Sequence, residues 1–374
     1  MIYGIYPLSD ATIYEASEST IPGLTNPSTI NTGLDAVLDI SKTFDSAEQP
    51  YNSRALLKFD LTTISQSISA GTISNPKFYL NLYTTEADEI PVNYTLYAYA
   101  VSQSWNMGTG RYSNIPPTTD GVSWKYRLNS TNTGSAWLTG SFAAGSTGSS
   151  ASNSGGGTWY TAYEATQSFD YQTTDVRMDV TSIVNAWLNS TITNDGFVVK
   201  KSDTDEASAD TFLSLKFFSR DTNTIYSPKL QVAWDDSGIA TGSLSPLSDI
   251  YSSTVYIKNN QSEYVKDSRV RFRIGARAQY PTRAFVTQSS YVTANNYLPT
   301  SSYYGVKYLD KEDYVIPIDE NYTKISCDSE GNYIDLWMDG LQPEVYYRFV
   351  FKVVDSTGTL YIDKKRDFIF KITR

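Results

Sequence analysis

Apolar and polar residues alternate along most of this chain, with the two-residue period of β-strands. Between residues 55 and 60, Ala55, Leu57 and Phe59 fall on one face and the residues between them on the other. The same kind of pattern predicts strands at residues 11–14, 36–41, 77–83, 94–100, 197–200, 212–219 and 229–234. The first part of the chain is therefore expected to be β-rich.

The period changes within residues 175–200. A strand-like alternation ends near Thr181, and the next apolar residues follow one face of a short helix, at positions 183, 184, 187 and 188. A side-chain oxygen of Asp179 or Thr181 can cap the first turn of this helix. No other segment has a convincing helical pattern. We expect the helix to close one end of a β-sandwich, with Trp187 in the core.

The alternation weakens between residues 103 and 171, where glycine, serine, threonine and asparagine dominate. Such a long insert in a compact domain is commonly functional or disordered, and residues 145–157 have the composition of a flexible loop. Four tryptophans lie in the insert, at positions 105, 124, 137 and 159. They indicate that much of the insert folds back onto other parts of the chain.

A second domain is expected from residue 239, after a break in the pattern at residues 235–238. Its predicted strands include 333–337, 347–354 and 368–372. Alternation also places Arg269, Arg271 and Arg273 on one face of a strand. This row is either a docking face for an acidic partner, another subunit or nucleic acid, or a solvated face whose arginines pair with acids on neighbouring strands.

Leu341, Pro343 and Tyr347 have the spacing of the tyrosine corner of fibronectin type III-like sandwiches, in which the tyrosine hydroxyl bonds to the backbone of the preceding turn. The expected fold is therefore all-β, with two tandem sandwiches. Residues 1–238 form the first, which is jelly-roll-like with one short helix. Residues 239–374 form the second, which is immunoglobulin- or fibronectin III-like.

Composition narrows the range of functions. The chain has 374 residues and a net charge of −10, which argues against general nucleic-acid binding. It contains no histidine and a single cysteine, Cys327, so serine–histidine triads, zinc clusters and an internal disulfide are excluded. We therefore predict no catalytic residue, no metal site and no cofactor.

An acidic segment leaves one alternative open. Asp203, Asp205, Glu206 and Asp210 lie close together in the sequence. They either form a solvated acidic loop or supply oxygen ligands for calcium.

The N-terminus shows no signal-peptide pattern, and no segment has the length of a membrane span. The product is thus expected to be soluble and made in a cytoplasm.

Several segments in order resemble the DNRLRE family of β-sandwich domains, which is related to carbohydrate-binding modules. They are A-L-L-K-F-D-L at 55–61, G-V-S-W at 121–124, D-V-T-S-I-V-N-A-W at 179–187, N-D-G-F-V-V-K at 194–200 and S-P-K-L-Q-V at 227–232. This resemblance implies a sandwich fold over most of residues 1–236. Its relatives in glycan biology imply sugar binding.

The whole chain also resembles virion structural proteins of tailed bacteriophages. The segments concerned are G-G-G-T-W-Y at 155–160, residues 298–304, C-D-S-E-G-N-Y at 327–333 and D-F-I-F-K at 367–371. This resemblance implies a non-enzymatic capsid, neck, tail or baseplate protein, present in many copies or as a homo-oligomer and in contact with other virion proteins. The alternative is a carbohydrate-binding module or adhesin for a host glycan, with exposed tryptophans stacking on sugar rings.

Overall fold

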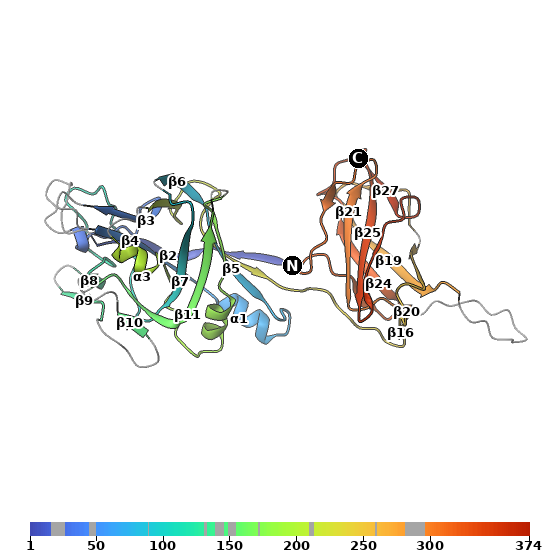
Figure 1. Ribbon diagram of the computed structural model, residues 1–374, viewed down its shortest axis with the longest axis horizontal. Helices are drawn as coiled ribbons and strands as arrows, with labels where there is room; N and C mark the ends of the chain where they lie inside the picture. Colours follow the sequence, from blue (N-terminus) through green and yellow to red (C-terminus); the bar gives the residue numbers. More distant parts are fainter. Residues whose placement is uncertain are drawn as a thin grey trace, which may run out of the picture. The chain divides into compact units, whose positions relative to one another are not determined.

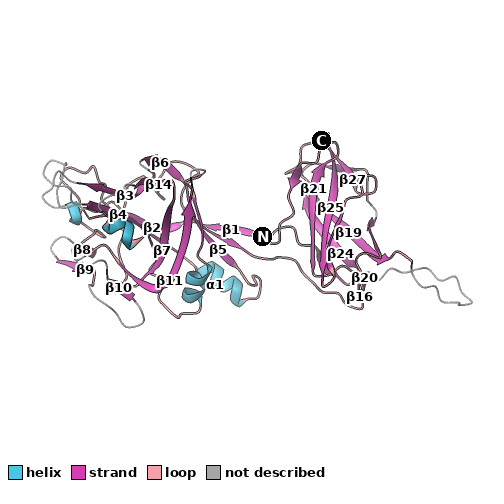
Figure 2. Cartoon of the chain, viewed as in Figure 1, coloured by secondary structure: helices cyan, strands magenta, loops and turns pink. Residues whose placement is uncertain are grey.

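The structure is a computed structural model that describes residues 1–15, 27–44, 50–88, 90–130, 133–138, 146–148, 155–170, 173–208, 213–258, 260–280 and 296–374. Strands dominate it, and the predicted all-β class is confirmed (Figure 2). The chain divides into two compact units, residues 2–233 and residues 234–374 with Met1. This division falls a few residues before the boundary expected from the sequence. No helix of the described residues is long and apolar enough to cross a membrane.

The first unit contains two large antiparallel sheets. The smaller runs in the order β1 (Ile2–Ile5), β15 (Lys229–Ala233), β5 (Lys77–Leu82), β12 (Val176–Asp179). The larger runs in the order β10 (Ser146–Gly148), β11 (Thr158–Phe169), β7 (Tyr94–Val101), β13 (Phe197–Lys201), β4 (Pro50–Phe59), β3 (Val37–Phe44), β14 (Leu213–Phe218), β6 (Thr84–Asp88), and β2 (Pro7–Tyr14) also pairs with β4. A small hairpin, β8 (Tyr126–Ser130) and β9 (Thr133–Ala136), stands apart from both sheets.

Alternation predicts the inward faces of these strands well. Phe78, Leu80 and Leu82 of β5 are fully buried, as are Leu96 and Ala98 of β7. The larger sheet, however, is covered on both faces. Its outer face packs against the tryptophans of residues 105–159 in one apolar cluster, made of Ala11, Ile13, Leu56, Val101, Trp105, Val122, Trp124, Trp137, Trp159 and Val198.

The expected insert therefore has structure of its own. Strand β11 pairs with β7 from Trp159 to Phe169 and belongs to the larger sheet, so the insert ends well before residue 171. Residues 149–154 of its glycine- and serine-rich run lie outside the described residues. The tryptophans fold back onto the sheet, as the sequence indicated.

The predicted helix is present as α2 (Thr181–Leu188), and the Asp179 carboxylate accepts a hydrogen bond from the Thr181 N–H at 2.9 Å. The expectation of a single helix is wrong, because α1 (Thr62–Ser69), α3 (Asp203–Ala207) and a short 3₁₀ helix (Pro27–Thr29) are also present. Helices α1 and α2 lie side by side at one end of the first unit (Figure 1). Trp187 is 6% exposed and packs on Phe197, with ring centroids 4.6 Å apart.

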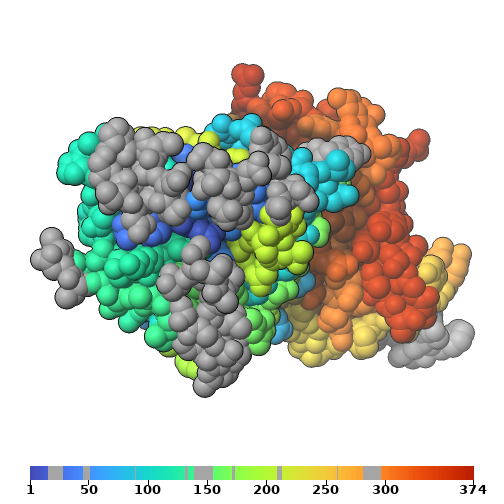
Figure 3. Space-filling view, turned by 60° about the vertical axis from the view of Figure 1, so that its left-hand side comes forward, coloured from blue at the N-terminus to red at the C-terminus, as the bar shows by residue number. Residues whose placement is uncertain are grey.

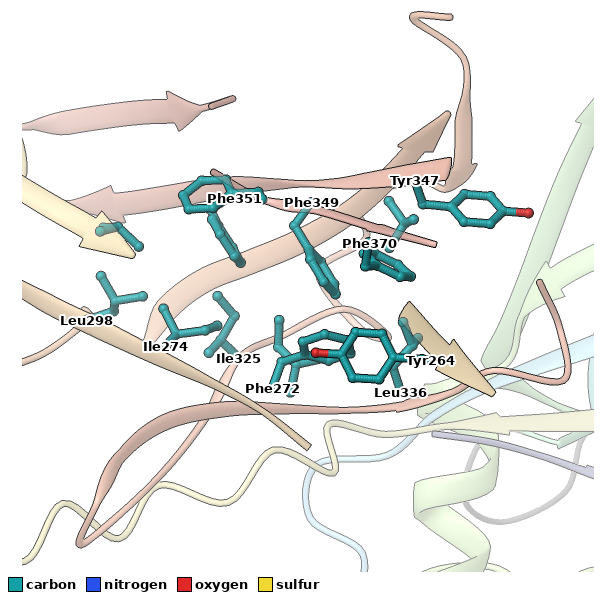
Figure 4. Packing of buried hydrophobic residues seen from close by; sticks show 14 of the residues in the cluster. Tyr264, Phe272, Ile274, Leu298, Ile325, Leu336, Tyr347, Phe349, Phe351 and Phe370 are labelled. Carbon is teal, nitrogen blue, oxygen red and sulfur yellow. The ribbon is translucent and has the colours of Figure 1, made fainter. Parts of the chain in front are cut away.

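The second unit is a sandwich of two six-stranded sheets. One runs β16 (Ser245–Pro246), β20 (Asn296–Tyr297), β19 (Arg269–Ala278), β24 (Gly331–Trp337), β23 (Ser326–Asp328), with β17 (Ser253–Lys258) beside β19. The other runs β18 (Glu263–Val265), β27 (Ile369–Thr373), β25 (Tyr346–Asp355), β21 (Ser301–Tyr308), β22 (Tyr314–Ile316), with β26 (Gly358–Ile362) beside β25. Between them, Phe349 and Phe370 point toward Phe272 (Figure 4).

Candidate interaction face

The predicted arginine row lies on the outer face of the first of these two sheets. Val270, Phe272 and Ile274 of β19 turn inward to the core, so the arginines between them turn outward. Strand β24 runs antiparallel beside them and places Trp337 opposite Arg269, Asp335 opposite Arg271 and Tyr333 opposite Arg273. We call these six outward residues the arginine–aromatic face.

Acids on neighbouring strands pair with all three arginines. The Asp335 carboxylate accepts hydrogen bonds from Arg269 at 3.0 Å and from Arg271 at 2.7 and 2.8 Å. Arg273 contacts Asp328 at 2.6 Å and Glu330 at 3.0 Å. The hydrogen bond from Arg271 lowers the pKa of Asp335, and the hydrogen bond from Arg273 lowers that of Asp328. Both aspartates are therefore ionised near neutral pH.

Aromatic rings fill the spaces between the guanidinium groups. The Tyr333 ring centroid lies 4.1 Å from Arg271 Cζ and 5.3 Å from Arg273 Cζ. The Trp337 ring lies 5.5 Å from Arg269 Cζ and is 59% exposed. Because each guanidinium is held by both a carboxylate and a ring, the face is ordered before any partner arrives.

Of the two interpretations of the row, the pairing with cross-strand acids is observed. Three arginines face three acids, Asp328, Glu330 and Asp335, so the face has little net charge. Such a surface lacks the excess positive charge that phosphate backbones require. Its exposed Trp337, Arg269 and Arg271 and its half-buried Tyr333 and Arg273 instead match the residue types enriched at protein interfaces.

The tyrosine corner has the expected geometry. The Tyr347 hydroxyl accepts a hydrogen bond from the Gln342 N–H at 2.9 Å and donates one to the Gln342 carbonyl oxygen at 3.2 Å. Leu341 is buried beneath the turn, and Pro343 follows Gln342 within it. Burial of the ring raises the pKa of Tyr347, which keeps its hydroxyl protonated as a donor.

The four tryptophans of the insert do not form an exposed row. Trp105, Trp124, Trp137 and Trp159 are 7%, 2%, 2% and 4% exposed. Two of them enclose Arg54, whose Cζ lies 4.6 Å from the Trp124 ring and 5.2 Å from the Trp159 ring. These side chains are therefore core and not a platform for sugar rings.

The acidic segment is not a solvated loop. Ser202 caps α3 by accepting a hydrogen bond from the Asp205 N–H, and Glu206 is 6% exposed. The space-filling view shows the yellow-green segment that includes α3 beside the blue N-terminal strands (Figure 3). No group of three or more acidic or cysteine residues able to hold a metal is found in the described part of the chain, and Asp210 lies outside it.

Glu206 belongs to a buried ion network that the sequence pattern did not predict. Its carboxylate accepts hydrogen bonds from Arg54 at 3.0 and 2.6 Å, and Lys200 Nζ lies 3.0 Å away. Burial alone would raise the pKa of Glu206, but the charges of Arg54 and Lys200 hold it below its usual value. Nη1 of Arg54 donates a further hydrogen bond to the Gly156 carbonyl oxygen at 2.6 Å. The network therefore ties β4, β13, α3 and the end of the insert together.

Comparisons with known proteins add no assignment. No protein-family model matches the sequence, and no curated protein matches it significantly.

Proposed function

We propose that this protein is a non-enzymatic structural protein of a tailed-bacteriophage particle, and that the arginine–aromatic face binds a neighbouring protein of the particle. The observation that supports this most is Trp337, which is 59% exposed yet held in place beside Arg269. Exposed tryptophan among ordered arginines is the typical centre of a protein–protein interface.

The charge pattern of the face favours a protein partner. Each arginine is already paired with an acid, so a partner gains little by supplying only negative charge. A partner gains more by burying the Trp337 ring and by hydrogen bonding to the outer edges of the guanidinium groups. Such a partner is a second copy of this chain or another particle protein.

The test is whether the chain is part of the particle at a fixed position. Particles purified from lysate would be examined by quantitative mass spectrometry and by immunogold labelling with antibody against the recombinant chain. We expect a reproducible copy number and gold at one location. Particles without gold and without peptides of this chain would contradict the proposal, and mass spectrometry excludes the case of a buried epitope.

A glycan-binding module or adhesin is the second candidate. The burial of the four insert tryptophans removes the platform expected for it, but Trp337 is 59% exposed on the outer face of β24, where a sugar ring can stack. Host-surface glycans titrated against the full chain would quench or shift Trp337 fluorescence in this case. The change would be lost in Trp337→Phe, which keeps the shape of an aromatic but removes the indole signal.

A further inference from the structure

Strand β1 is an open edge of the smaller sheet of the first unit. It pairs with β15 on one side, and no described strand lies on its other side. Just before it, the Met1 nitrogen donates to the Trp234 carbonyl oxygen at 2.7 Å, and the Trp234 N–H donates to the Met1 carbonyl oxygen at 3.1 Å. Because hydrogen-bonded and non-hydrogen-bonded pairs alternate along an antiparallel ladder, Tyr3 also directs its backbone groups to β15. The N–H and carbonyl groups of Ile2 and Gly4 therefore point to the open edge.

The side chains in and just after β1 are large, apolar and exposed. Ile2, Tyr3, Tyr6 and Leu8 are 51%, 49%, 61% and 57% exposed, and residues 1–9 carry no charged side chain. Tyr3 lies on the same face of the sheet as its register partner Val232, which is fully buried. The apolar face of the sheet thus continues from the covered core out to the open edge.

Two other sheet edges of the first unit are protected by charge. Strand β12, at the opposite edge of the smaller sheet, carries Arg177 and Asp179, and the Arg177 N–H donates to Gln167 Oε1 at 2.7 Å. Strand β6, at one edge of the larger sheet, carries Glu86 and Asp88. Charged side chains on an edge strand oppose the addition of a further strand, and β1 has none.

We propose that β1 pairs with β1 of a second copy of this chain, antiparallel and about a two-fold axis. The free backbone groups set the register. Ile2 of each copy lies opposite Gly4 of the other and exchanges hydrogen bonds with it, and the two Tyr3 residues face each other at the axis. An aromatic pair directly opposite across a ladder is stabilising.

The charge of the chain favours this occupant. Copies with a net charge of −10 repel each other, and the uncharged residues 1–9 let two sheets meet without placing like charges opposite. The strand is its own complement, because each copy supplies the apolar strand that the other lacks. Pairing closes both open edges together, so the assembly ends at a dimer.

The size of the contact sets its strength. The four exposed side chains offer on the order of 400 Å² of apolar surface per copy, about half of the ~800 Å² per partner that a stable interface buries. Complexes of this size are weak and reversible. We therefore expect a dissociation constant of about 1–100 µM.

Sedimentation velocity of the full-length chain, with any purification tag at the C-terminus, tests this between about 1 and 300 µM. We expect a monomer–dimer equilibrium. Tyr3→Lys and Tyr3→Glu each place like charges opposite at the axis and should each weaken the dimer about tenfold. An equal mixture of the two variants should dimerise again, which damage to the fold cannot produce. A monomer at every concentration, or an unchanged dimer in both variants, would overturn the proposal.

Trp337→Ala separates this dimer from any contact through the arginine–aromatic face. Trp337 belongs to the second unit, so the variant should dimerise like the parent. Loss of the dimer in Trp337→Ala, with retention in the two Tyr3 variants, would assign self-association to the arginine–aromatic face and overturn the proposal.

A cysteine at the axis tests the register. The single native cysteine, Cys327, is buried, so Tyr3→Cys adds one accessible thiol. The Cα atoms of a non-hydrogen-bonded antiparallel pair lie within the range of a disulfide, so mild oxidation should give a covalent dimer. Tyr251→Cys, at a position 55% exposed in the second unit, is the control and should stay monomeric under the same conditions. Equal crosslinking of both variants, or crosslinking of Tyr3→Cys to a different protein in purified particles, would overturn the proposal.

Discussion

The guanidinium group of Arg54 forms two hydrogen bonds with the carboxylate of Glu206, 152 residues later in the chain, and both side chains are buried. Bidentate geometry and a third bond to the Gly156 carbonyl oxygen give acceptors to three of the five N–H groups of Arg54, and the Trp124 and Trp159 rings lie against the guanidinium group. A buried ion pair of this kind is stable because each charge compensates the other. Removing one partner leaves the other charge buried and uncompensated.

Glu206→Gln is therefore expected to lower the free energy of unfolding by about 3–5 kcal/mol. The glutamine keeps the shape of the side chain but leaves Arg54 without its counter-charge and leaves Lys200 with only the exposed Asp203. Urea denaturation followed by tryptophan fluorescence measures this, since Trp124 and Trp159 surround Arg54. Glu86→Gln, which breaks an exposed pair with Lys216 in the same unit, is the control and should change little. Equal effects of the two variants would show that the buried pair is not stabilising.

The buried Lys201 predicts how the stability of the fold depends on pH. Its Nζ is buried and has no hydrogen-bond partner among the residues that the structure describes, and burial lowers its pKa from 10.5 to about 7. Between pH 7 and 10.5 the unfolded chain binds more protons at this residue than the folded chain, so stability rises with pH in that window. The contribution of this group is about 1.4 kcal/mol per pH unit.

Lys201→Met should remove that dependence. The variant is expected to be more stable than the parent at or below pH 7, and the difference should shrink as pH rises toward 10.5. Denaturation curves at intervals from pH 6 or so upward measure the difference. A constant difference across the range would show that Lys201 titrates normally in the folded protein.

Trp337→Ala tests whether the arginine–aromatic face is needed for assembly of the particle, because the substitution should leave the stability of the chain almost unchanged. Because the side chain is 59% exposed, the free energy of unfolding should change by no more than about 0.5 kcal/mol. If the arginine–aromatic face binds a neighbour, the amount of the chain in purified particles should nevertheless fall about tenfold or more. Tyr361→Ala is a matched control, since Tyr361 is 60% exposed and lies on the opposite sheet. Normal incorporation of Trp337→Ala would exclude this face as the contact.

Tyr347→Phe isolates the hydroxyl of the tyrosine corner. The variant keeps the buried ring but removes both hydrogen bonds to Gln342, which should lower the free energy of unfolding by about 1–3 kcal/mol. Calorimetry of the full chain measures the change. Tyr346→Phe, its 50% exposed neighbour on the same strand, should have almost no effect. Similar effects at both positions would mean that the corner bonds do not stabilise the unit.

The sequence pattern predicts an element correctly where that element buries a single stripe of residues. Strands β5 and β7 and helix α2 each bury one stripe of residues, so their periods are visible in the sequence. The arginine row was also placed on the correct face, because the apolar residues between the arginines face the core.

Helix α1 was missed because T-T-I-S-Q-S-I-S is rich in residues with low helix propensity and buries only Ile64. A repeated motif could have identified it. Asp60 accepts a hydrogen bond from the Thr62 N–H at 2.9 Å, as Asp179 does from Thr181, and D-L-T-T-I matches D-V-T-S-I. Both helices follow a strand of the first unit, so the repeat marks a recurring strand-to-helix turn.

The buried ion network could not be predicted from alternation. Arg54 shares a face of β4 with Leu56, and taken alone that face would be exposed to solvent. Only the tryptophans of a distant segment make it an interior, and no local pattern indicates where a distant segment packs. The same long-range packing explains why the exposed tryptophan platform was not found.

Packing on both faces of the larger sheet also limits how the chain can be shortened. A deletion of residues 104–138 would look like the trimming of a polar loop, yet it would uncover Ile13, Leu56 and Val198 together. An open apolar patch on a sheet is a typical site of aggregation. The segment therefore protects the apolar face of the larger sheet from aggregation. Expression of the chain without this segment should yield inclusion bodies instead of a smaller folded domain.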